Sequence, residues 1–125
     1  MRQKAFVLIA ALAACLSASA QAIIKFDKTV INFGTFPEKK PQYCEFTFKN
    51  TGDKPLVIQQ AYGSCGCTVP SIPKDPIEPG GRGVIKVSYN GKRQYEGYFK
   101  KLITVRSNAA NSVVRVYIEG TMKAE

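Results

Sequence analysis

Two cysteines separated by one glycine, Cys65-Gly66-Cys67, have the strongest potential for chemistry in this chain. A disulfide between them would close a very small ring, short of the usual Cα separation, and such a bond would be strained and relatively oxidising. Two thiolates so close together could instead bind a soft ion such as Cu(I) or Zn²⁺. The third interpretation is structural, with the cysteines cross-linked or packed in the interior.

The structural interpretation involves another cysteine, Cys44. It shares one face of a predicted strand with Phe46 and Phe48, so it should point into the protein. If this strand and the one ending near Ala61 are antiparallel neighbours, a bond from Cys44 to Cys65 or Cys67 is feasible. Closing a loop of ~20 residues stabilises a domain by about 3 kcal/mol on the chain-entropy model. We favour this structural role and keep thiol redox chemistry and metal binding as alternatives.

The sequence offers little else for catalysis. It contains no histidine, which removes the commonest proton shuttle and the usual partner of a serine or cysteine nucleophile. The nine carboxylates are scattered, and zinc wants about four ligands, of which the chain supplies few. We therefore predict no catalytic residue, no metal site, no cofactor and no enzymatic activity.

Residues 1–20 have the features of a signal peptide. Arg2 and Lys4 precede an apolar run, and Ala18-Ser19-Ala20 matches a cleavage site. The run is far shorter than the ~20 residues that span a bilayer. We predict export to the periplasm or the cell exterior, with residues 21–125 as the mature domain. The alternative is a lipoprotein anchored to the membrane through Cys15, which follows a lipobox-like segment.

The basic charge of the chain does not by itself identify a partner. The formal net charge is +9, and removing Arg2 and Lys4 with the signal peptide leaves 16 basic against 9 acidic residues, or +7. Such a surplus can attract nucleic acid or anionic surfaces. Because no basic run exceeds two residues and exported proteins rarely meet nucleic acid, we interpret the charge as a solvated surface.

Alternation with a period of two dominates the mature chain, and no helical periodicity is sustained. About seven short strands separated by turn residues predict an immunoglobulin-like β-sandwich. The first is a pair of short strands or one broken strand. The expected strands cover residues 24–33, 43–49, 56–61, 84–89, 98–107 and 113–120, and the proline-rich stretch 70–76 should be a loop or an edge.

The last two strands also predict a register. If Asn108 faces Asn111 across a two-residue turn, Val105 opposes Val114 and Ile103 opposes Val116. The same register places Lys100 opposite Glu119, a favourable cross-strand charge pair. A separate signal, Asn90-Gly91, is typical of a type I′ turn.

Several motifs occur here in a characteristic order. They include Phe33-Gly34-Thr35-Phe36, the segment 46–52 with Asn50-Thr51-Gly52, Ser64-Cys65-Gly66-Cys67-Thr68, Pro79-Gly80 and the segment 103–108. Together they resemble the bacterial domain-of-unknown-function 1573 family over residues 22–123. The resemblance implies a small exported domain related to the ASH and major-sperm-protein sandwiches. It implies no activity and assigns no catalytic residue.

From these observations we expect a non-enzymatic module that binds another envelope protein or a glycan, or that has a structural role. Immunoglobulin-like domains usually bind through sheet edges and end loops, so the loops from Gly63 to Pro79 are the expected contact region. We expect membrane contact only if Cys15 is lipidated. The candidate binding-loop residues are Gly63, Ser64, Gly66, Thr68 and Pro70.

Overall fold

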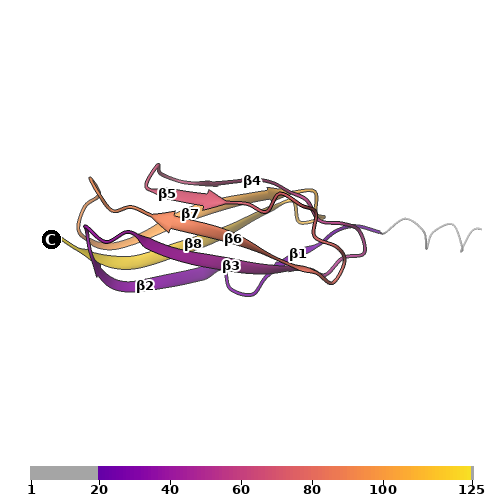
Figure 1. Ribbon diagram of the computed structural model, residues 1–125, viewed down its shortest axis with the longest axis horizontal. Helices are drawn as coiled ribbons and strands as arrows, with labels where there is room; N and C mark the ends of the chain where they lie inside the picture. Colours follow the sequence, from indigo (N-terminus) through magenta and orange to yellow (C-terminus); the bar gives the residue numbers. More distant parts are fainter. Residues whose placement is uncertain (1–19, 125) are drawn as a thin grey trace, which may run out of the picture.

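Residues 20–124, described by a computed structural model, form two four-stranded β-sheets packed face to face (Figure 1). The strands are β1 (Ile24–Phe26), β2 (Val30–Pro37), β3 (Gln42–Asn50), β4 (Ile58–Gly63), β5 (Thr68–Ser71), β6 (Arg82–Tyr89), β7 (Gly97–Ser107) and β8 (Val113–Lys123). Within these residues, no helix is long and apolar enough to cross a membrane. The predicted signal peptide and Cys15 lie outside the described residues, Ala20 excepted.

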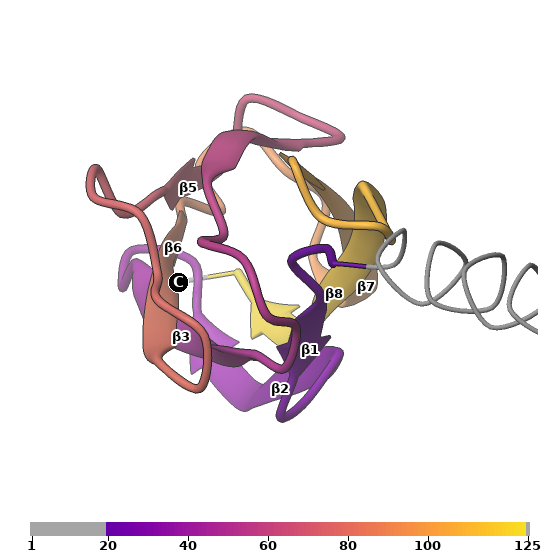
Figure 2. The same ribbon diagram turned by 90° about the vertical axis from the view of Figure 1, so that its right-hand side faces the viewer.

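The two sheets have the strand orders β1-β3-β6-β5 and β2-β8-β7-β4. Strand β2 runs parallel to β8, whereas every other pair is antiparallel. The chain changes sheets between β1 and β2, so the predicted first element is a pair of strands that belong to different sheets. The predicted all-β sandwich is confirmed, with eight strands, and Figure 2 shows the two sheets on opposite sides of the interior.

Two groups of aromatic side chains fill the space between the sheets. Phe26 packs against Phe46 and Phe48, with ring centroids 6.5 and 5.5 Å apart. At the other end Tyr89 stacks on Phe99 at 4.4 Å, and Phe33 and Phe36 surround this pair. Edge-to-face and offset-stacked rings add favourable quadrupole interactions to the burial of their area. Phe46 and Phe48 therefore face the interior, as predicted for the strand at residues 43–49.

The predicted register of β7 and β8 is also confirmed, since Val105 pairs with Val114, Ile103 with Val116, and Lys100 with Glu119. The charged groups of Lys100 and Glu119 contact other residues instead. Tyr98 donates a hydrogen bond to Glu119 at 2.5 Å, and the Lys100 ammonium lies 5.0 Å from the centre of the Tyr117 ring. The buried faces of the two strands fix the register, whereas the charged groups on the outer face contact neighbouring tyrosines.

Two arrangements considered from the sequence are absent. The predicted strand at residues 56–61 is not an antiparallel neighbour of the strand at residues 43–49, because β4 joins β7 in the opposite sheet. Asn90-Gly91 is not a type I′ turn, since that turn requires positive φ at both central residues and neither has it. The chain instead uses seven residues between β6 and β7. Pro70 does lie in an edge strand, β5, as expected for a proline in a sheet.

A buried asparagine, Asn50, closes the end of the sandwich opposite Tyr89. Its side-chain amide donates to the carbonyls of Lys54 and Ile77 at 2.7 and 2.9 Å. Its side-chain oxygen accepts from the backbone N–H of Gly52 and Ile23. Because Asn50 has no exposed surface, four hydrogen bonds satisfy an otherwise costly polar group and hold three loop segments together.

The chain crosses back between the sheets over the four residues that separate β4 from β5. At this crossing Gly63 touches the start of β5: a Cβ at Gly63 would lie 2.7 Å from the Thr68 carbonyl oxygen and 2.9 Å from the Thr68 Cβ. Such distances lie inside van der Waals contact, and the first partner is backbone that cannot rotate away. Only glycine allows the two strands to approach so closely.

We predict that Gly63→Ala lowers the free energy of unfolding by about 2 kcal/mol, because the added methyl group overpacks the crossing. Gly66→Ala is the matched control: it lies three residues farther along the same crossing, has no positive φ, and a Cβ there meets nothing within 4 Å. Its effect should stay within about 0.5 kcal/mol. Chemical denaturation of both variants measures the difference, and equal effects would contradict the close approach.

Candidate functional site

The loop that contains the Cys-Gly-Cys motif is held at both sides by backbone hydrogen bonds. Ser64 N–H donates to the Leu102 carbonyl at 2.9 Å, and the Leu102 N–H donates to the Ser64 hydroxyl oxygen at 3.3 Å. On the other side, Asn90 N–H donates to the Cys67 carbonyl at 2.9 Å. The loop is therefore fixed to β7 in one sheet and to the end of β6 in the other.

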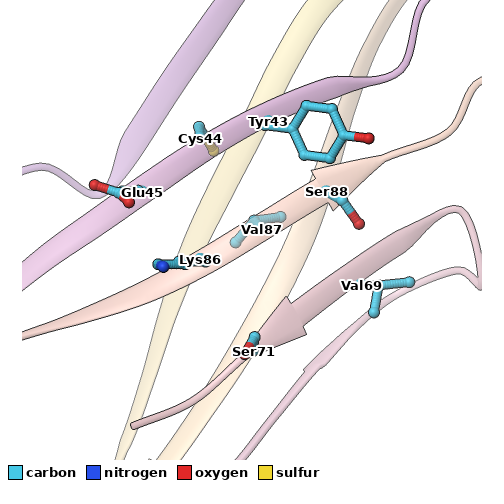
Figure 3. Close-up of a pocket in the computed structure, with 8 residues that line it drawn as sticks. All are labelled: Tyr43, Cys44, Glu45, Val69, Ser71, Lys86, Val87 and Ser88. Atoms are coloured by element: carbon cyan, nitrogen blue, oxygen red, sulfur yellow. The ribbon is translucent and has the colours of Figure 1, made fainter.

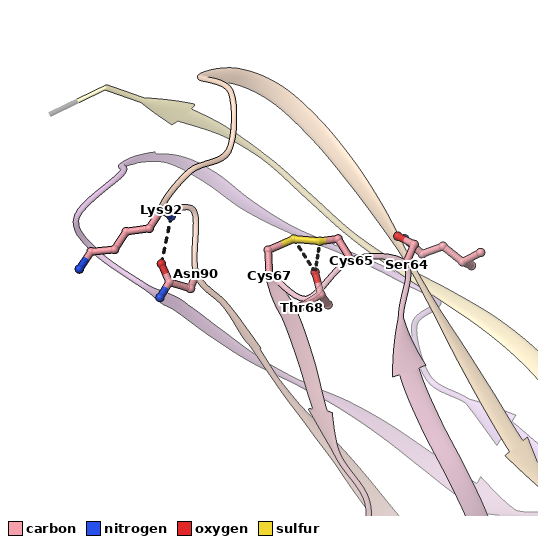
Figure 4. The surroundings of a disulfide bond; sticks show 7 residues. Ser64, Cys65, Cys67, Thr68, Asn90 and Lys92 are labelled. Carbon is pink, nitrogen blue, oxygen red and sulfur yellow. Dashed lines mark hydrogen bonds between the residues drawn. A yellow bond between two sulfur atoms is a disulfide. The ribbon is translucent and has the colours of Figure 1, made fainter.

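Cys65 and Cys67 form a disulfide within this loop (Figure 4). Their Cα atoms are 5.3 Å apart, which lies inside the usual range for disulfides. The expectation that the ring would be too short for that range was therefore wrong. The Thr68 hydroxyl lies 3.6 Å from the Cys67 sulfur and 3.8 Å from the Cys65 sulfur, so one polar group contacts both ends of the bond.

Cys44 lies apart from this pair and is a free thiol. Cys44 and Pro70 both pair with Val87, from opposite sides of β6. Cys67 precedes Pro70 by three residues, so strand spacing puts its Cα ~14 Å from that of Cys44. Disulfides need Cα atoms within about 7 Å. The bond considered from Cys44 to Cys65 or Cys67 is therefore absent from the structure.

The environment of Cys44 suppresses its reactivity. Its side chain is half-buried and packs against the core. Burial raises the pKa of the Cys44 thiol to about 11, and the negative charge of Glu45 adds to the increase. Because the thiolate is the nucleophilic form, Cys44 stays an unreactive thiol at neutral pH. It acts as a small core residue.

A cationic turn lies beside the disulfide. Gln94 N–H donates to the Gly91 carbonyl at 2.9 Å, closing a turn in which Arg93 has a φ of 68°. This left-handed conformation costs a side-chain-bearing residue of order 1 kcal/mol or more. The turn and Cys67 share a cleft of about 480 Å³. The lining residues are Gly66, Cys67, Asn90, Lys92, Arg93 and Gln94.

A second concave region, which we call the outer-face groove, lies on the solvent side of β3, β6 and β5 (Figure 3). Tyr43, Ser88 and Val69 form one cross-strand row, and the small Ser88 lies between two exposed side chains. Tyr43 is 74 % exposed and Val69 57 % exposed. The groove measures about 350 Å³ and is lined by Tyr43, Cys44, Glu45, Val69, Ser71, Lys86, Val87 and Ser88.

The predicted binding-loop residues differ in their access to a partner. Gly66 is exposed at the loop tip, and Ser64 is exposed but bonded to β7. Gly63 and Pro70 are half-buried, and Thr68 is only 3 % exposed, so its side chain serves the interior.

Sequence reasoning missed Tyr43, Val69 and Ser88. Tyr43 belongs to the predicted strand at residues 43–49, but no sequence signal showed which strands flank it.

Metal binding gains no support from the arrangement of side chains. Among residues 20–124, no three cysteine, aspartate or glutamate side chains lie close enough together to hold a metal ion. Both sulfurs of the motif are also engaged in the disulfide and offer no thiolate. Two surface features are the candidates for function: the disulfide with its cationic cleft, and the outer-face groove.

Comparison with solved structures supports the fold. A protein of unknown function from Porphyromonas gingivalis W83 is 14% identical, with a TM-score of 0.73, over 86% of this chain and 50% of that chain. The ASH/PapD-like domain 7 of human CEP192 is 11% identical, with a TM-score of 0.64, over 87% of this chain and 91% of that domain. The Vibrio cholerae VesB protease is 16% identical, with a TM-score of 0.60, over 80% of this chain and 31% of the protease.

These similarities show the fold alone because every identity is low. The chain spans half of the Porphyromonas protein and about a third of the protease. No curated protein matches the chain at a significant level. The family model described as "Protein of unknown function (DUF1573)" matches residues 24–122, nearly all of the predicted mature domain. The chain therefore belongs to the DUF1573 family, as its ordered motifs indicated.

Proposed function

We propose that this protein is an exported, non-enzymatic module that binds an extended segment of another envelope protein in the outer-face groove. The observation that carries the proposal is the apolar row at the groove, where Tyr43 and Val69 stand exposed on either side of Ser88. Large apolar side chains next to a concavity are typical of binding sites in otherwise polar surfaces.

The shape of the groove favours a side chain from an extended partner. Ser88 is small, so an aliphatic or aromatic side chain could lie above it, between the Tyr43 ring and Val69 (Figure 3). The next row along the sheet, Glu45, Lys86 and Ser71, offers polar groups at the rim. An apolar centre with a polar rim is the usual anatomy of a protein contact.

The charge of the same face favours acidic residues in the partner. Lys86 lines the groove opposite Glu45, which balances its charge, and the surplus of positive charge comes from Lys25 and Lys49, which pair farther along the same face. Arg82 is partly neutralised, since it forms an ion pair with Asp27 at 2.9 Å. The partner segment should therefore carry one large apolar residue with acidic residues next to it, which would steer its approach.

Two further observations support a non-enzymatic, exported protein. The chain has no histidine, and its one free thiol among the described residues, Cys44, is held protonated. The disulfide is typical of proteins that work in an oxidising compartment. The match to a protease covers a minor part of that enzyme and transfers no activity, since fold does not imply function.

The test uses synthetic peptides in which one Phe, Leu or Ile is flanked by aspartates, with backbone amide chemical shifts as the readout. We predict that such peptides perturb the amides of residues 43–45, 86–88, Val69 and Ser71. Tyr43→Ser and Val69→Ser should each weaken binding by about tenfold, because either change removes apolar area from the contact.

Tyr95→Ser is the matched control, since Tyr95 is 96 % exposed and lies outside the groove. It should bind the peptides as well as the unchanged protein. Equal losses for Tyr43→Ser and Tyr95→Ser, or perturbed amides elsewhere on the sandwich, would contradict the proposal. Binding of acidic oligosaccharides with the same perturbed amides, and none with peptides, would replace the protein partner with a glycan.

A further inference from the structure

We propose that the Cys65–Cys67 disulfide exchanges with small anionic thiols, which the cationic turn at Lys92 and Arg93 recruits to the neighbouring cleft. The proposal concerns a different site from the outer-face groove, and neither depends on the other. It rests on three features that meet at one end of the sandwich: an intraloop disulfide, a cleft that reaches one of its sulfurs, and two basic residues in that cleft.

The reaction is two successive thiol–disulfide exchanges. A thiolate of the small molecule attacks the Cys67 sulfur, a mixed disulfide forms, the Cys65–Cys67 bond breaks, and Cys65 leaves as a thiolate that takes up a proton. A second thiolate attacks the sulfur of the small molecule in that mixed disulfide and releases Cys67 as a thiolate. The products are two protein thiols and one small-molecule disulfide, so the protein is reduced and the small thiol is oxidised. The reverse reaction re-forms the protein disulfide.

The geometry selects the attacked sulfur and the size of the thiol. Cys67 lines the cleft, whereas Cys65 does not. Because Cys67 is only 9 % exposed, a small thiol can reach it more easily than a cysteine on a folded protein. The Thr68 hydroxyl, within 3.8 Å of both sulfurs, can donate a hydrogen bond to the departing thiolate.

The charges around the cleft favour an anionic reagent. Lys92 and Arg93 both line it and are exposed, and Figure 4 shows the Lys92 side chain extending from this turn on the side away from the disulfide. The acidic residue of this loop, Glu96, is not part of the cleft and accepts a hydrogen bond from Ala124 N–H at 3.4 Å. The turn thus places two exposed positive charges at the rim of the cleft that reaches Cys67, which raises the local concentration of anions.

The conformation of Arg93 is a further indication that this residue has a role. Its φ of 68° lies where asparagine or glycine is favoured, so the turn would be less strained with either residue. Strain of this kind often accompanies function. Cys44 does not interfere with the exchange, because it is distant and its thiol stays protonated.

The experiment measures the rate at which the oxidised protein is reduced by three thiols: 2-mercaptoethanesulfonate, 2-mercaptoethanol and cysteamine. As thiolates they carry two, one and no net negative charges. Samples are quenched by alkylation and weighed by mass spectrometry. The variant K92Q/R93N is compared with the unchanged protein, and K54Q/K74Q, which removes two exposed charges at the other end of the sandwich, is the matched control.

We expect K92Q/R93N to slow reduction of the disulfide by 2-mercaptoethanesulfonate by about three- to tenfold. Reduction by 2-mercaptoethanol should slow less, and reduction by cysteamine hardly at all. The differences should shrink at 1 M salt. K54Q/K74Q should leave all three rates unchanged. R93N alone should keep or raise the melting temperature, because asparagine tolerates the left-handed conformation, so slower exchange would not reflect unfolding. Equal slowing of the three thiols, no slowing, or three free thiols in the unreduced protein would overturn the proposal.

Discussion

The structure depends on one short crossing. Strand β4 belongs to one sheet and β5 to the other, and only four residues, including Cys65 and Cys67, join them. Stacked sheets are ~10 Å apart, so a connection of four residues has little spare length. The crossing is possible because Gly63 lets the two strands touch, and it is fixed by the hydrogen bonds to Leu102 and Asn90. The Cys65–Cys67 disulfide further restricts the conformational freedom of this loop.

Both proposed sites follow from this crossing. It delivers β5 to the edge of its sheet beside β6, which places Val69 opposite Ser88 and completes the outer-face groove. The same crossing brings Cys67 against the loop after β6, where Asn90 binds its carbonyl and Arg93 shares its cleft. The proposed protein-binding groove and the proposed thiol-exchange site thus both depend on this one strand connection, although each uses its own residues.

Much of the fold could be predicted because burial is periodic. Phe46 and Phe48 alternate with polar residues, and the register of β7 and β8 followed from matching their apolar faces. Which strands lie next to one another was harder to predict from the sequence. The contact of Gly63 with Thr68 and the flanking of Ser88 by Tyr43 and Val69 depend on which strands become neighbours, and local sequence does not contain that information. The disulfide was predicted only as an alternative, because ring size alone suggested a separation shorter than the loop adopts.

The central claim is that the cysteines of the motif bond to each other and leave Cys44 free. Digestion of the non-reduced protein with trypsin, after alkylation of free thiols, tests this claim directly. Cys44 should lie in a peptide of residues 40–49, while Cys65 and Cys67 share a peptide of residues 50–74. The structure predicts an intact, unalkylated 50–74 peptide, lighter than its reduced form by one pair of hydrogens, and no link to 40–49. A cross-linked pair of these peptides would contradict the account.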